Sequence, residues 1–515
     1  MLGMNECSRI DFCFPLMVIK TMTSTTQVLH KSKFRYAILI GLVVAGLQAE
    51  FSFGKDLERS ATIKPNFIII FADDLGYGDI GAFGSKRNRT PNLDRMAKEG
   101  MKLTSFYAAP ACTPSRAQLL TGCYAKRVSL PHVLNPLSVT GLNAKEHTIG
   151  ELLQQQGYAT MVVGKWHVGD HPDFLPTRHG FHHYFGLPYS NDMGSDDIAL
   201  GNVSRPPLPL VRDETVIEEI RPNDQDNLTE RYTEEAVKFI RDKKNHPFFL
   251  YLPHTAVHTP VHPGAKFRGK SASPFSDWVE ELDWSVGRIL DTVQSLNLSK
   301  NTLIIFTSDN GPWLPKGTNA GTAFPLRGGK GSTWEGGVRV PTLAWWPGQV
   351  PKETVSDAVA ANFDFLPTLV ELAGGGVPKD RIIDGENIAP ILFGKAKKTK
   401  RNGHYYFNAN KLEAVRSGPW KLKFAGLNGS NLNTKEIGVV KPSPMLFNLE
   451  TDLSEQTDVF DKNPSIVERL QLLVAKMDND LGVTNNGPGI RLPGRVENPS
   501  GLRLPIRSTP TNPIK

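Results

Sequence analysis

Four segments that are apolar almost throughout, each followed closely by a polar cluster, constrain the fold of this 515-residue chain more than any other feature. A strand that is apolar on both faces must be covered on both, as the strands of parallel sheets are. The pattern predicts strands over 66–71, 159–163, 247–252 and 302–307, which end in Asp-Asp, Lys-Trp-His, a histidine-containing segment and Asp-Asn.

Helical segments alternate with these strands. Helices are predicted over 92–100, 148–156, 229–244 and 278–296. Such alternation indicates an α/β fold built on a mainly parallel sheet. Ligands of these sheets bind beyond the carboxyl ends of the strands, so we expect the polar clusters to meet at one edge. The alternative for each single cluster is an ordinary polar turn.

A cysteine precedes another predicted helix in the segment 108–122. Pro110 and Pro114 fix φ and lack an N–H, so Cys112 is expected in a non-helical approach, with Gly122 as the helix stop. The N–H groups of a helix start favour an anion, and Arg116 one turn on adds a permanent positive charge. The alternative is a small buried cysteine in a turn.

Cys112-Thr113-Pro114-Ser115-Arg116, followed by Leu-Thr-Gly, resembles the signature of the type I sulfatases. The resemblance extends over about 66–458, and the segment 186–194 is similar to one in arylsulfatase A and N-acetylgalactosamine-6-sulfatase relatives. It implies an alkaline-phosphatase-like sandwich with a large, mainly parallel sheet between helices. It also implies that a formylglycine-generating enzyme oxidises Cys112 to formylglycine, whose hydrate is the nucleophile.

Hard oxygen ligands dominate two of the clusters. Asp73, Asp74, Asp309 and Asn310 offer oxygens that suit Ca²⁺ or Mg²⁺, and no Cys/His spacing suits zinc. Three carboxylates packed together would repel one another without a divalent cation. The group resembles the sulfatase metal site, which implies Ca²⁺, with Mg²⁺ as the alternative, and the side chain derived from Cys112 as a further ligand.

A second set of candidates is cationic: Arg116, Lys165, His167, His258 and Lys330. Lys330 lies in the glycine-rich segment 326–341, where glycines allow the backbone to approach a ligand closely. The spacing does not match a phosphate-binding P-loop, and an ordinary solvated lysine is the alternative. The segment as a whole is similar to the sulfatase lysine loop.

The resemblance implies a mechanism for these residues. The metal, Arg116 and Lys165 hold the hydrated formylglycine, and Asp309 activates the hydroxyl that attacks sulfur. The metal, Lys165, His258 and Lys330 stabilise the sulfuryl oxygens. His258 or Lys330 protonates the leaving alcohol, and His167 takes the proton of the second hydroxyl.

The termini and the cysteines bear on location. Lys31, Lys33 and Arg35 precede an apolar run over 36–47 and a small residue at Ala49, as in a signal peptide. The run is shorter than the ~20 residues of a spanning helix, so we expect export without a stable membrane anchor. Beyond this leader remain two cysteines, whose pairing in a Cys112–Cys123 disulfide is the alternative to modification.

The expected organisation is a leader over 1–50, a catalytic α/β domain over 60–394 and a C-terminal α+β subdomain over 403–484. The subdomain pairs a small antiparallel sheet, with strands near 404–407, 412–416, 420–424 and 445–448, with one packed helix. The region 199–221, rich in proline and charge, reads as an inserted surface loop. Residues 485–515 read as a disordered basic tail.

These features predict hydrolysis of a sulfate ester, of a carbohydrate or an aryl alcohol, to alcohol and inorganic sulfate. Two alternatives remain: a phosphodiesterase or phosphonate monoester hydrolase of the same superfamily, and an inactive calcium-dependent carbohydrate-binding protein. The formal net charge of +7, without a long Lys/Arg cluster, favours anionic small ligands weakly and does not indicate nucleic acid. The sequence indicates no oligomeric state.

Overall fold

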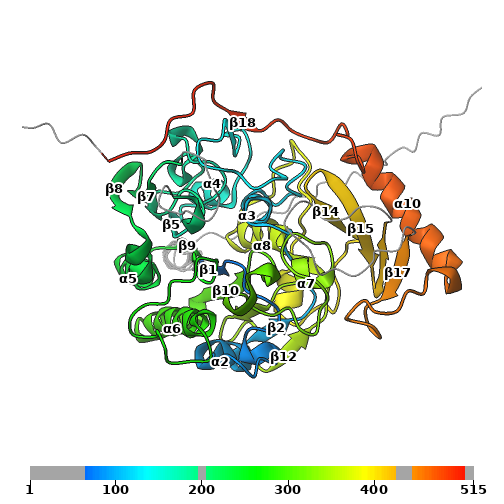
Figure 1. Cartoon of the computed structure of the whole chain (residues 1–515), viewed down its shortest axis with the longest axis horizontal. Helices are drawn as coiled ribbons and strands as arrows, with labels where there is room; N and C mark the ends of the chain where they lie inside the picture. Colours follow the sequence, from blue (N-terminus) through cyan, green and yellow to red (C-terminus); the bar gives the residue numbers. More distant parts are fainter. Residues whose placement is uncertain (1–63, 195–204, 425–443, 505–515) are drawn as a thin grey trace, which may run out of the picture. The chain divides into compact units, whose positions relative to one another are not determined.

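The apolar segments form the centre of a ten-stranded sheet (Figure 1). The computed structural model describes residues 64–194, 205–424 and 444–504. Strands β1 (Asn66–Ala72), β5 (Ala159–Val163), β9 (Phe248–Pro253) and β10 (Thr302–Ser308) lie side by side in the order β10-β1-β9-β5, and all pair in parallel. The predicted mainly parallel sheet is confirmed.

Six further strands extend the sheet on both sides, in the full order β12-β2-β11-β10-β1-β9-β5-β6-β7-β8. Strand β6 (His183–Gly186) continues the parallel part. On the other side lie β11 (Thr342–Trp345), which runs antiparallel to β10, then β2 (Met101–Leu103) and β12 (Thr354–Ser356). The parallel core is therefore five strands wide, from β10 to β6.

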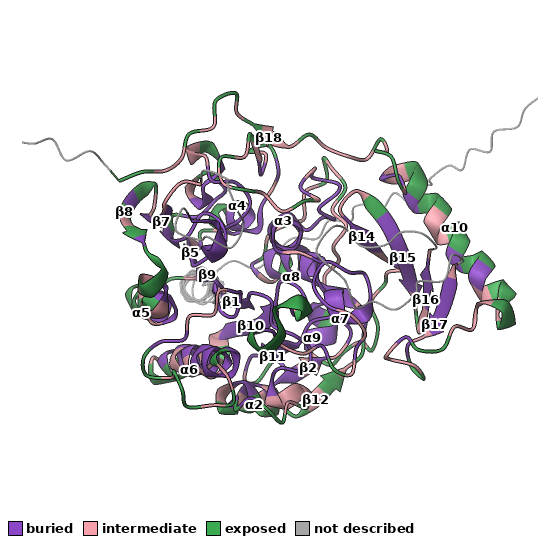
Figure 2. Cartoon of the chain, viewed as in Figure 1, coloured by how far each residue is buried: buried purple, intermediate pink, exposed green. Residues whose placement is uncertain are grey.

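Each face of the sheet carries its own hydrophobic core. Phe67, Ile69 and Phe71 of β1 belong to one core, and the alternating residues Ile68 and Ile70 belong to the other. Successive side chains of a strand point to opposite faces of the sheet. Because both faces are covered, all five side chains are fully buried, and Figure 2 shows β1 as buried. Full burial of each such side chain stabilises the fold by roughly 1.5–3 kcal/mol.

Helices cover the two faces in separate groups. The face with Phe67 packs against α3 (Cys112–Thr121), α4 (Ile149–Gln155), α8 (Phe365–Leu372) and α9 (Ala389–Leu392). The opposite face packs against α2 (Pro91–Glu99), α5 (Leu228–Asp242) and α6 (Pro274–Ser295). The short helix α7 (Glu335–Val338) follows the lysine loop. Two two-stranded sheets pair β3 (Phe106–Tyr107) with β13 (Ala360–Ala361) and β4 (Thr140–Gly141) with β18 (Gly494–Arg495).

The predicted C-terminal sheet is also present. Strands β14 (His404–Asn408), β15 (Lys411–Ser417), β16 (Trp420–Lys423) and β17 (Met445–Asn448) pair antiparallel in sequence order. Helix α10 (Pro464–Asp480) packs on this sheet through its apolar stripe. Its opposite side is exposed (Figure 2).

The prediction of a surface loop over 199–221 is wrong for the described residues 205–221. They form an antiparallel hairpin, β7 (Leu208–Arg212) and β8 (Thr215–Ile220), that ends the large sheet. Leu208, Leu210 and Val211 are buried in β7, and Val216 and Ile220 are buried in β8. The prolines and charges around these short apolar segments concealed the two strands.

The prediction of disorder from 485 is wrong as far as 504. Strand β18 pairs with β4, and Arg491 donates to both carboxylate oxygens of Glu146, at 2.7 and 2.8 Å. Backbone pairing and an ion pair hold this segment, and Ile490 and Leu502 pack at the edges of two apolar cores. The composition of the segment gave no sign of these long-range contacts. Residues 505–515 and the predicted leader lie outside the described residues. None of the helices that the structure describes is both long enough and apolar enough to cross a membrane.

Candidate active site

The four predicted polar clusters converge at one edge of the sheet. Ala72 at the end of β1 pairs with Ser308 at the end of β10, so the acidic residues that follow each strand are neighbours. The next two strands, β9 and β5, add the histidine and Lys-Trp-His clusters at the same edge. Parallel strands make this possible because their carboxyl ends point the same way.

The acidic residues form one buried group. Ligand oxygens of Asp73, Asp74 and Asp309 all lie within 4.8 Å of one another. The Asp74 N–H donates to Asp309 Oδ1 at 3.1 Å, and Asn310 Nδ2 donates to Asp74 Oδ1 at 2.7 Å. Asp74 has a left-handed backbone with φ 61°, a strained conformation for a non-glycine residue that turns the chain from strand into cluster.

The chemistry of this group fits a hard divalent cation. Asp73 Oδ1 and Asn310 Oδ1 are buried without a hydrogen-bond partner among the described residues, which is rare for buried oxygens. Burial and the charge of Asp73 raise the pKa of Asp309. Burial acts to raise the pKa of Asp73 too, but the charges of Lys165, His258 and Arg116 outweigh it and hold that pKa well below its usual range. A bound Ca²⁺ or Mg²⁺ would offset the repulsion between the carboxylates and would give Asp73 Oδ1 and Asn310 Oδ1 a partner.

Cys112 is brought to the same place as the first residue of α3, so the prediction that it lies in a non-helical approach before the helix is wrong. Ala111 before it is extended, Pro114 lies in the first turn, and the helix ends at Gly122 with φ 69°. The Cys112 sulfur, a ring nitrogen of His258 and an Asp73 oxygen lie within 4.8 Å of one another. Burial raises the pKa of the Cys112 thiol to about 11, so an unmodified side chain is protonated at neutral pH. Cys112 and Cys123 are both free, so the disulfide alternative is excluded.

Arg116 and Lys165 are fully buried beside the carboxylates. Arg116 Nη2 lies 3.0 Å from Asp309 Oδ2 and 3.4 Å from Asp73 Oδ2, while its Nη1 donates to the Lys165 carbonyl at 2.7 Å. Lys165 Nζ donates to Asp73 Oδ2 at 2.6 Å. Cys112, which is one helical turn before Arg116, is therefore surrounded by fixed charges of both signs.

Lys330 and His258 also reach the cluster, and both lie close to Asp74. Lys330 Nζ lies 2.7 Å from Asp74 Oδ1, and His258 Nε2 lies 3.6 Å from Asp74 Oδ2. Burial acts to lower the pKa of Lys330, but Asp74 more than compensates and keeps the ammonium charged. Burial and the charge of Lys330 lower the pKa of His258, so its ring is neutral at pH 7.

His167 is buried close to these charges. Its backbone is left-handed, with φ 59°, and its Nε2 lies 3.0 Å from the Leu134 carbonyl. The other ring nitrogen, Nδ1, is buried without a partner among the described residues. Burial, and then the charges of Lys165 and Arg116, push the pKa of His167 well below its usual value. Every residue predicted for the site thus lies in or beside one cluster.

Sequence reasoning missed three residues of this cluster. Ser190 Oγ accepts from Lys165 Nζ at 3.0 Å, and Asp192 is buried with Oδ1 unpartnered among the described residues. Both lie in the segment 186–194, which was recognised as a whole but not residue by residue. The Trp313 ring lies 5.6 Å from the His258 ring and 4.8 Å from Lys330 Nζ. The sequence offered one indication that Trp313 belongs to the site, which is its position shortly after Asp309-Asn310.

His254 contributes no ligand to the cation groups found among the described residues. Its Nε2 lies 3.1 Å from Ser285 Oγ on α6, and burial lowers its pKa to about 3. These contacts fit a structural role for His254. His179, which follows the Lys-Trp-His motif in the sequence, packs its ring on Trp166, and burial lowers its pKa to about 4.

The C-terminal sheet anchors the loop that carries Lys330. Lys423 Nζ and Glu413 Oε2 both bond the Thr333 hydroxyl, at 2.7 and 2.6 Å. Lys421 Nζ donates to the Thr333 carbonyl at 2.7 Å and pairs with Glu335 Oε1 at 2.9 Å. Because all of these groups are buried, the loop position depends on a sheet that is remote in sequence.

A sheet between two helical layers, with a buried acidic and cationic cluster at its strand ends, defines an α/β enzyme of alkaline-phosphatase-like fold. The chain matches the family model described as Sulfatase over residues 65–375. It also matches N-sulphoglucosamine sulphohydrolase, C-terminal, over 329–422, and C-terminal region of aryl-sulfatase over 399–487.

Comparisons with individual proteins indicate the same family as the family models do. The chain is 38% identical over 457 residues to arylsulfatase A of Bos taurus, covering 81% of this chain and 89% of the relative. It is 39% identical over 409 residues to N-acetylgalactosamine-6-sulfatase of Canis lupus familiaris, covering 76% and 75%. The solved PsFucS1 sulfatase from Pseudoalteromonas sp. superposes with a TM-score of 0.74 at 30% identity, covering 84% and 94%. The chain therefore belongs to the sulfatase family, and it is a sulfuric ester hydrolase.

Proposed function

We propose that this enzyme hydrolyses sulfate esters of saccharides through formylglycine formed at Cys112, with a divalent cation in the adjacent acidic group. The observation that carries the proposal is the meeting of Cys112, His258 and three carboxylates in one buried cluster. Oxidation of Cys112 by a formylglycine-generating enzyme would supply a geminal diol, in which one hydroxyl is the nucleophile and the other allows sulfate to leave.

The cation would be held by oxygens of Asp73, Asp74, Asp309 and Asn310, with the Cys112-derived side chain completing the set. Ca²⁺ is the better match, and Mg²⁺ is the alternative. When bound, the ion would neutralise the carboxylates and polarise a sulfuryl oxygen. The two unpartnered oxygens, Asp73 Oδ1 and Asn310 Oδ1, support this assignment.

The roles of the remaining residues follow from their contacts. Arg116 and Lys165, which are fully buried, orient the nucleophilic side chain and offset negative charge on it. Lys330 and His258 both lie close to Asp74, and one of them protonates the oxygen of the leaving alcohol. Asp309 takes the proton of the attacking hydroxyl.

His167 is assigned the proton of the second hydroxyl, the step that expels sulfate. Its depressed pKa keeps the ring neutral, and its Nδ1 has no partner among the described residues and is free to accept. Lys165, which donates to Ser190 Oγ, lies where it would balance the negative charge that develops on the departing sulfate. Two separate basic groups, Asp309 and His167, thus serve the two halves of the reaction.

A saccharide substrate is favoured by the relatives. One is named for N-acetylgalactosamine 6-sulfate esters, and the arylsulfatase relatives suggest that aryl sulfates serve as test substrates. We also propose that the enzyme is exported, because the basic, apolar and small residues near 31–49 follow the order of a signal peptide.

The test combines mass spectrometry with turnover of matched esters. The protein, produced with a formylglycine-generating enzyme, should yield a Cys112 peptide with the mass of the aldehyde and should release sulfate from 4-nitrophenyl sulfate. Cys112→Ala should abolish release, whereas Cys123→Ser, at the other buried free cysteine, should retain it. An unmodified thiol in a turning-over enzyme would refute the nucleophile.

The same assay decides between the alternatives. Faster phosphate release from 4-nitrophenyl phosphate or a phosphonate monoester would indicate a phosphohydrolase of the superfamily. Absence of any ester turnover in fully modified, cation-loaded protein would indicate a binding protein.

A further inference from the structure

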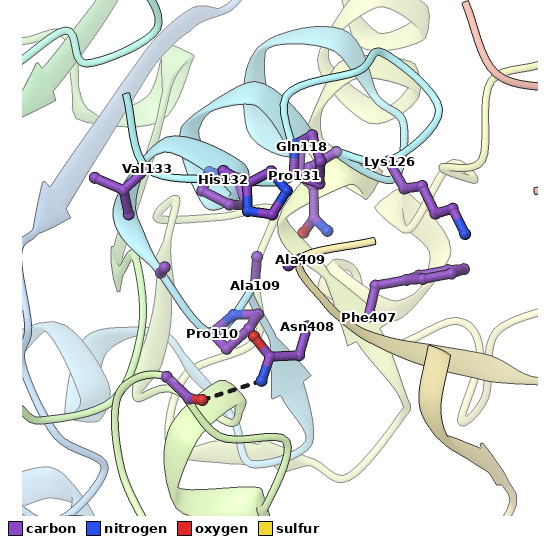
Figure 3. A pocket seen from close by; sticks show the side chains of 14 residues that line it. Ala109, Pro110, Gln118, Lys126, Pro131, His132, Val133, Phe407, Asn408 and Ala409 are labelled. Atoms are coloured by element: carbon purple, nitrogen blue, oxygen red, sulfur yellow. Dashed lines mark hydrogen bonds between the residues drawn. The ribbon is translucent and has the colours of Figure 1, made fainter. Parts of the chain in front are cut away.

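A small pocket lies beside the start of helix α3. Its volume is about 70 Å³. Figure 3 shows its walls: the 109–111 segment and α3, the 131–133 segment, and the end of β14. Ala111 in the wall precedes Cys112, and Gly331 in the wall follows Lys330. The Gly331 N–H donates to the Pro110 carbonyl at 2.7 Å, so both catalytic segments border the pocket.

The side-chain amide of Gln118 faces this pocket. It lies on α3 with only 6% of its surface exposed. Its side-chain amide has no hydrogen-bond partner among the described residues and points toward the space above Ala409 (Figure 3). An amide without a protein partner at the wall of a pocket can hydrogen-bond a ligand or water.

Asn408 offers a complementary acceptor from the opposite wall. Its Nδ2 donates to the Gly331 carbonyl and to Glu413 Oε1, both at 3.2 Å, and these two acceptors fix which end of the amide is nitrogen. Its Oδ1 therefore faces the pocket (Figure 3), without a partner among the described residues. Asn408 is 6% exposed, so its Oδ1 is as enclosed as the Gln118 amide.

The rest of the lining is apolar apart from Lys126 and His132, and the His132 Nε2 lies 3.3 Å from Asn410 Nδ2. Pro110, Pro114, Pro131 and Phe407 supply apolar walls. The ammonium of Lys126 points away from the space (Figure 3), where it donates to three backbone carbonyls at 2.7, 2.6 and 3.1 Å. Beside the His132 ring, the pocket therefore offers one amide donor and two amide acceptors, and the Lys126 ammonium is engaged elsewhere. Such a lining suits a neutral polar group with an apolar end and disfavours a sulfate or carboxylate.

We propose that this pocket binds the acetamido group of an N-acetylated amino sugar. The acetamido carbonyl accepts from Gln118 Nε2, its N–H donates to Asn408 Oδ1, and its methyl packs on Pro114, Pro131 and Phe407. The volume suits a substituent and is too small for a sugar ring. That this sugar also bears the scissile sulfate rests on the proposed function, since the pocket borders the segments of Cys112 and Lys330.

Saturation-transfer NMR tests the proposal without turnover. N-acetylgalactosamine, galactose and galactosamine differ at one carbon, which bears an acetamido, a hydroxyl or an ammonium group. We expect the acetamido methyl protons to receive the strongest saturation. We also expect N-acetylgalactosamine to bind about tenfold more tightly than the other two sugars, the effect of one or two neutral hydrogen bonds. Equal binding of galactose, or saturation spread evenly over ring protons, would overturn the proposal.

Gln118→Met removes the amide while keeping its length, and Gln155→Met on the exposed side of α4 is the matched control. Gln118→Met should remove the preference for N-acetylgalactosamine, and Gln155→Met should keep it. An unchanged preference in Gln118→Met would also overturn the assignment. In kinetics, the ratio of kcat/KM for N-acetylgalactosamine sulfates over galactose sulfates should fall about tenfold in Gln118→Met, with 4-nitrophenyl sulfate turnover as the reference.

The two proposals fail separately. Acetamido binding without sulfate release would leave this pocket assigned and reject the proposed reaction. Sulfate release without any acetamido preference would keep the reaction and reject the pocket.

Discussion

Replacing Lys421 by methionine is the sharpest test of how the C-terminal sheet supports the active site. Lys421 is fully buried, and its Nζ lies 2.9 Å from Glu335 Oε1 and 2.8 Å from Glu455 Oε1. Burial acts to lower the pKa of Lys421, but Glu335 and Glu455 raise it overall. Methionine fills much of the same space and leaves two buried carboxylates without their shared cation.

The expected loss of stability is large. Removing one partner of a buried ion pair costs about 3–5 kcal/mol, because the remaining charge stays in a low-dielectric site. With an unfolding entropy of ~2.1 cal/mol/K per residue, the unit Lys64–Lys515 would lose about 3–5 °C in Tm. Lys421 also holds the Thr333 carbonyl, so the loop of Lys330 should shift, and sulfate release should fall by about tenfold to a hundredfold.

Thermal and urea unfolding measure the first effect, and 4-nitrophenyl sulfate turnover measures the second. Lys476→Met, at an exposed position of α10, is the matched control and should change neither by much. Adding Glu455→Gln to Lys421→Met should recover at least ~1 kcal/mol, because it removes one of the stranded charges. If Lys421→Met unfolds within about 1 kcal/mol of the control, the ion-pair reasoning is wrong.

Two further predictions concern the cation and pH. Ca²⁺ should raise the Tm of the wild type, with about 2.7 kcal/mol of stabilisation at a hundredfold excess over Kd, and the rise should be smaller in Asn310→Ala; equal calcium shifts would exclude Asn310 as a ligand. Burial raises the pKa of Glu281 to about 8, so the native state binds a proton that the unfolded chain has released above its ordinary pKa. The stability that this proton provides is complete below pH ~4 and is lost as pH rises to about 8. Glu281→Gln should therefore lose roughly 3 kcal/mol less than the wild type between pH 4 and 8 in urea unfolding; parallel pH profiles would contradict it.

Much of the site was predictable because its residues follow buried strands directly. Asp73-Asp74 and Asp309-Asn310 stand at the ends of two apolar segments, and a parallel sheet brings such ends together whatever the loops do. Ser190, Asp192 and Trp313 were missed because they lie in loops without periodicity. Only the folded chain shows that they reach Lys165, His258 and Lys330.

The sequence by itself determined the parallel sheet, the acidic and cationic composition of the cluster and a helix next to Cys112 that ends before Gly122. These depend on local patterns: apolar runs, prolines before a helix and polar residues at strand ends. Tertiary structure alone decided that β7 and β8 extend the sheet, that residues 485–504 are held by Glu146 and β4, and that Lys421 and Lys423 anchor the Lys330 loop. Such contacts join residues far apart in sequence, and their energies come from burial and charge pairing that no local pattern records.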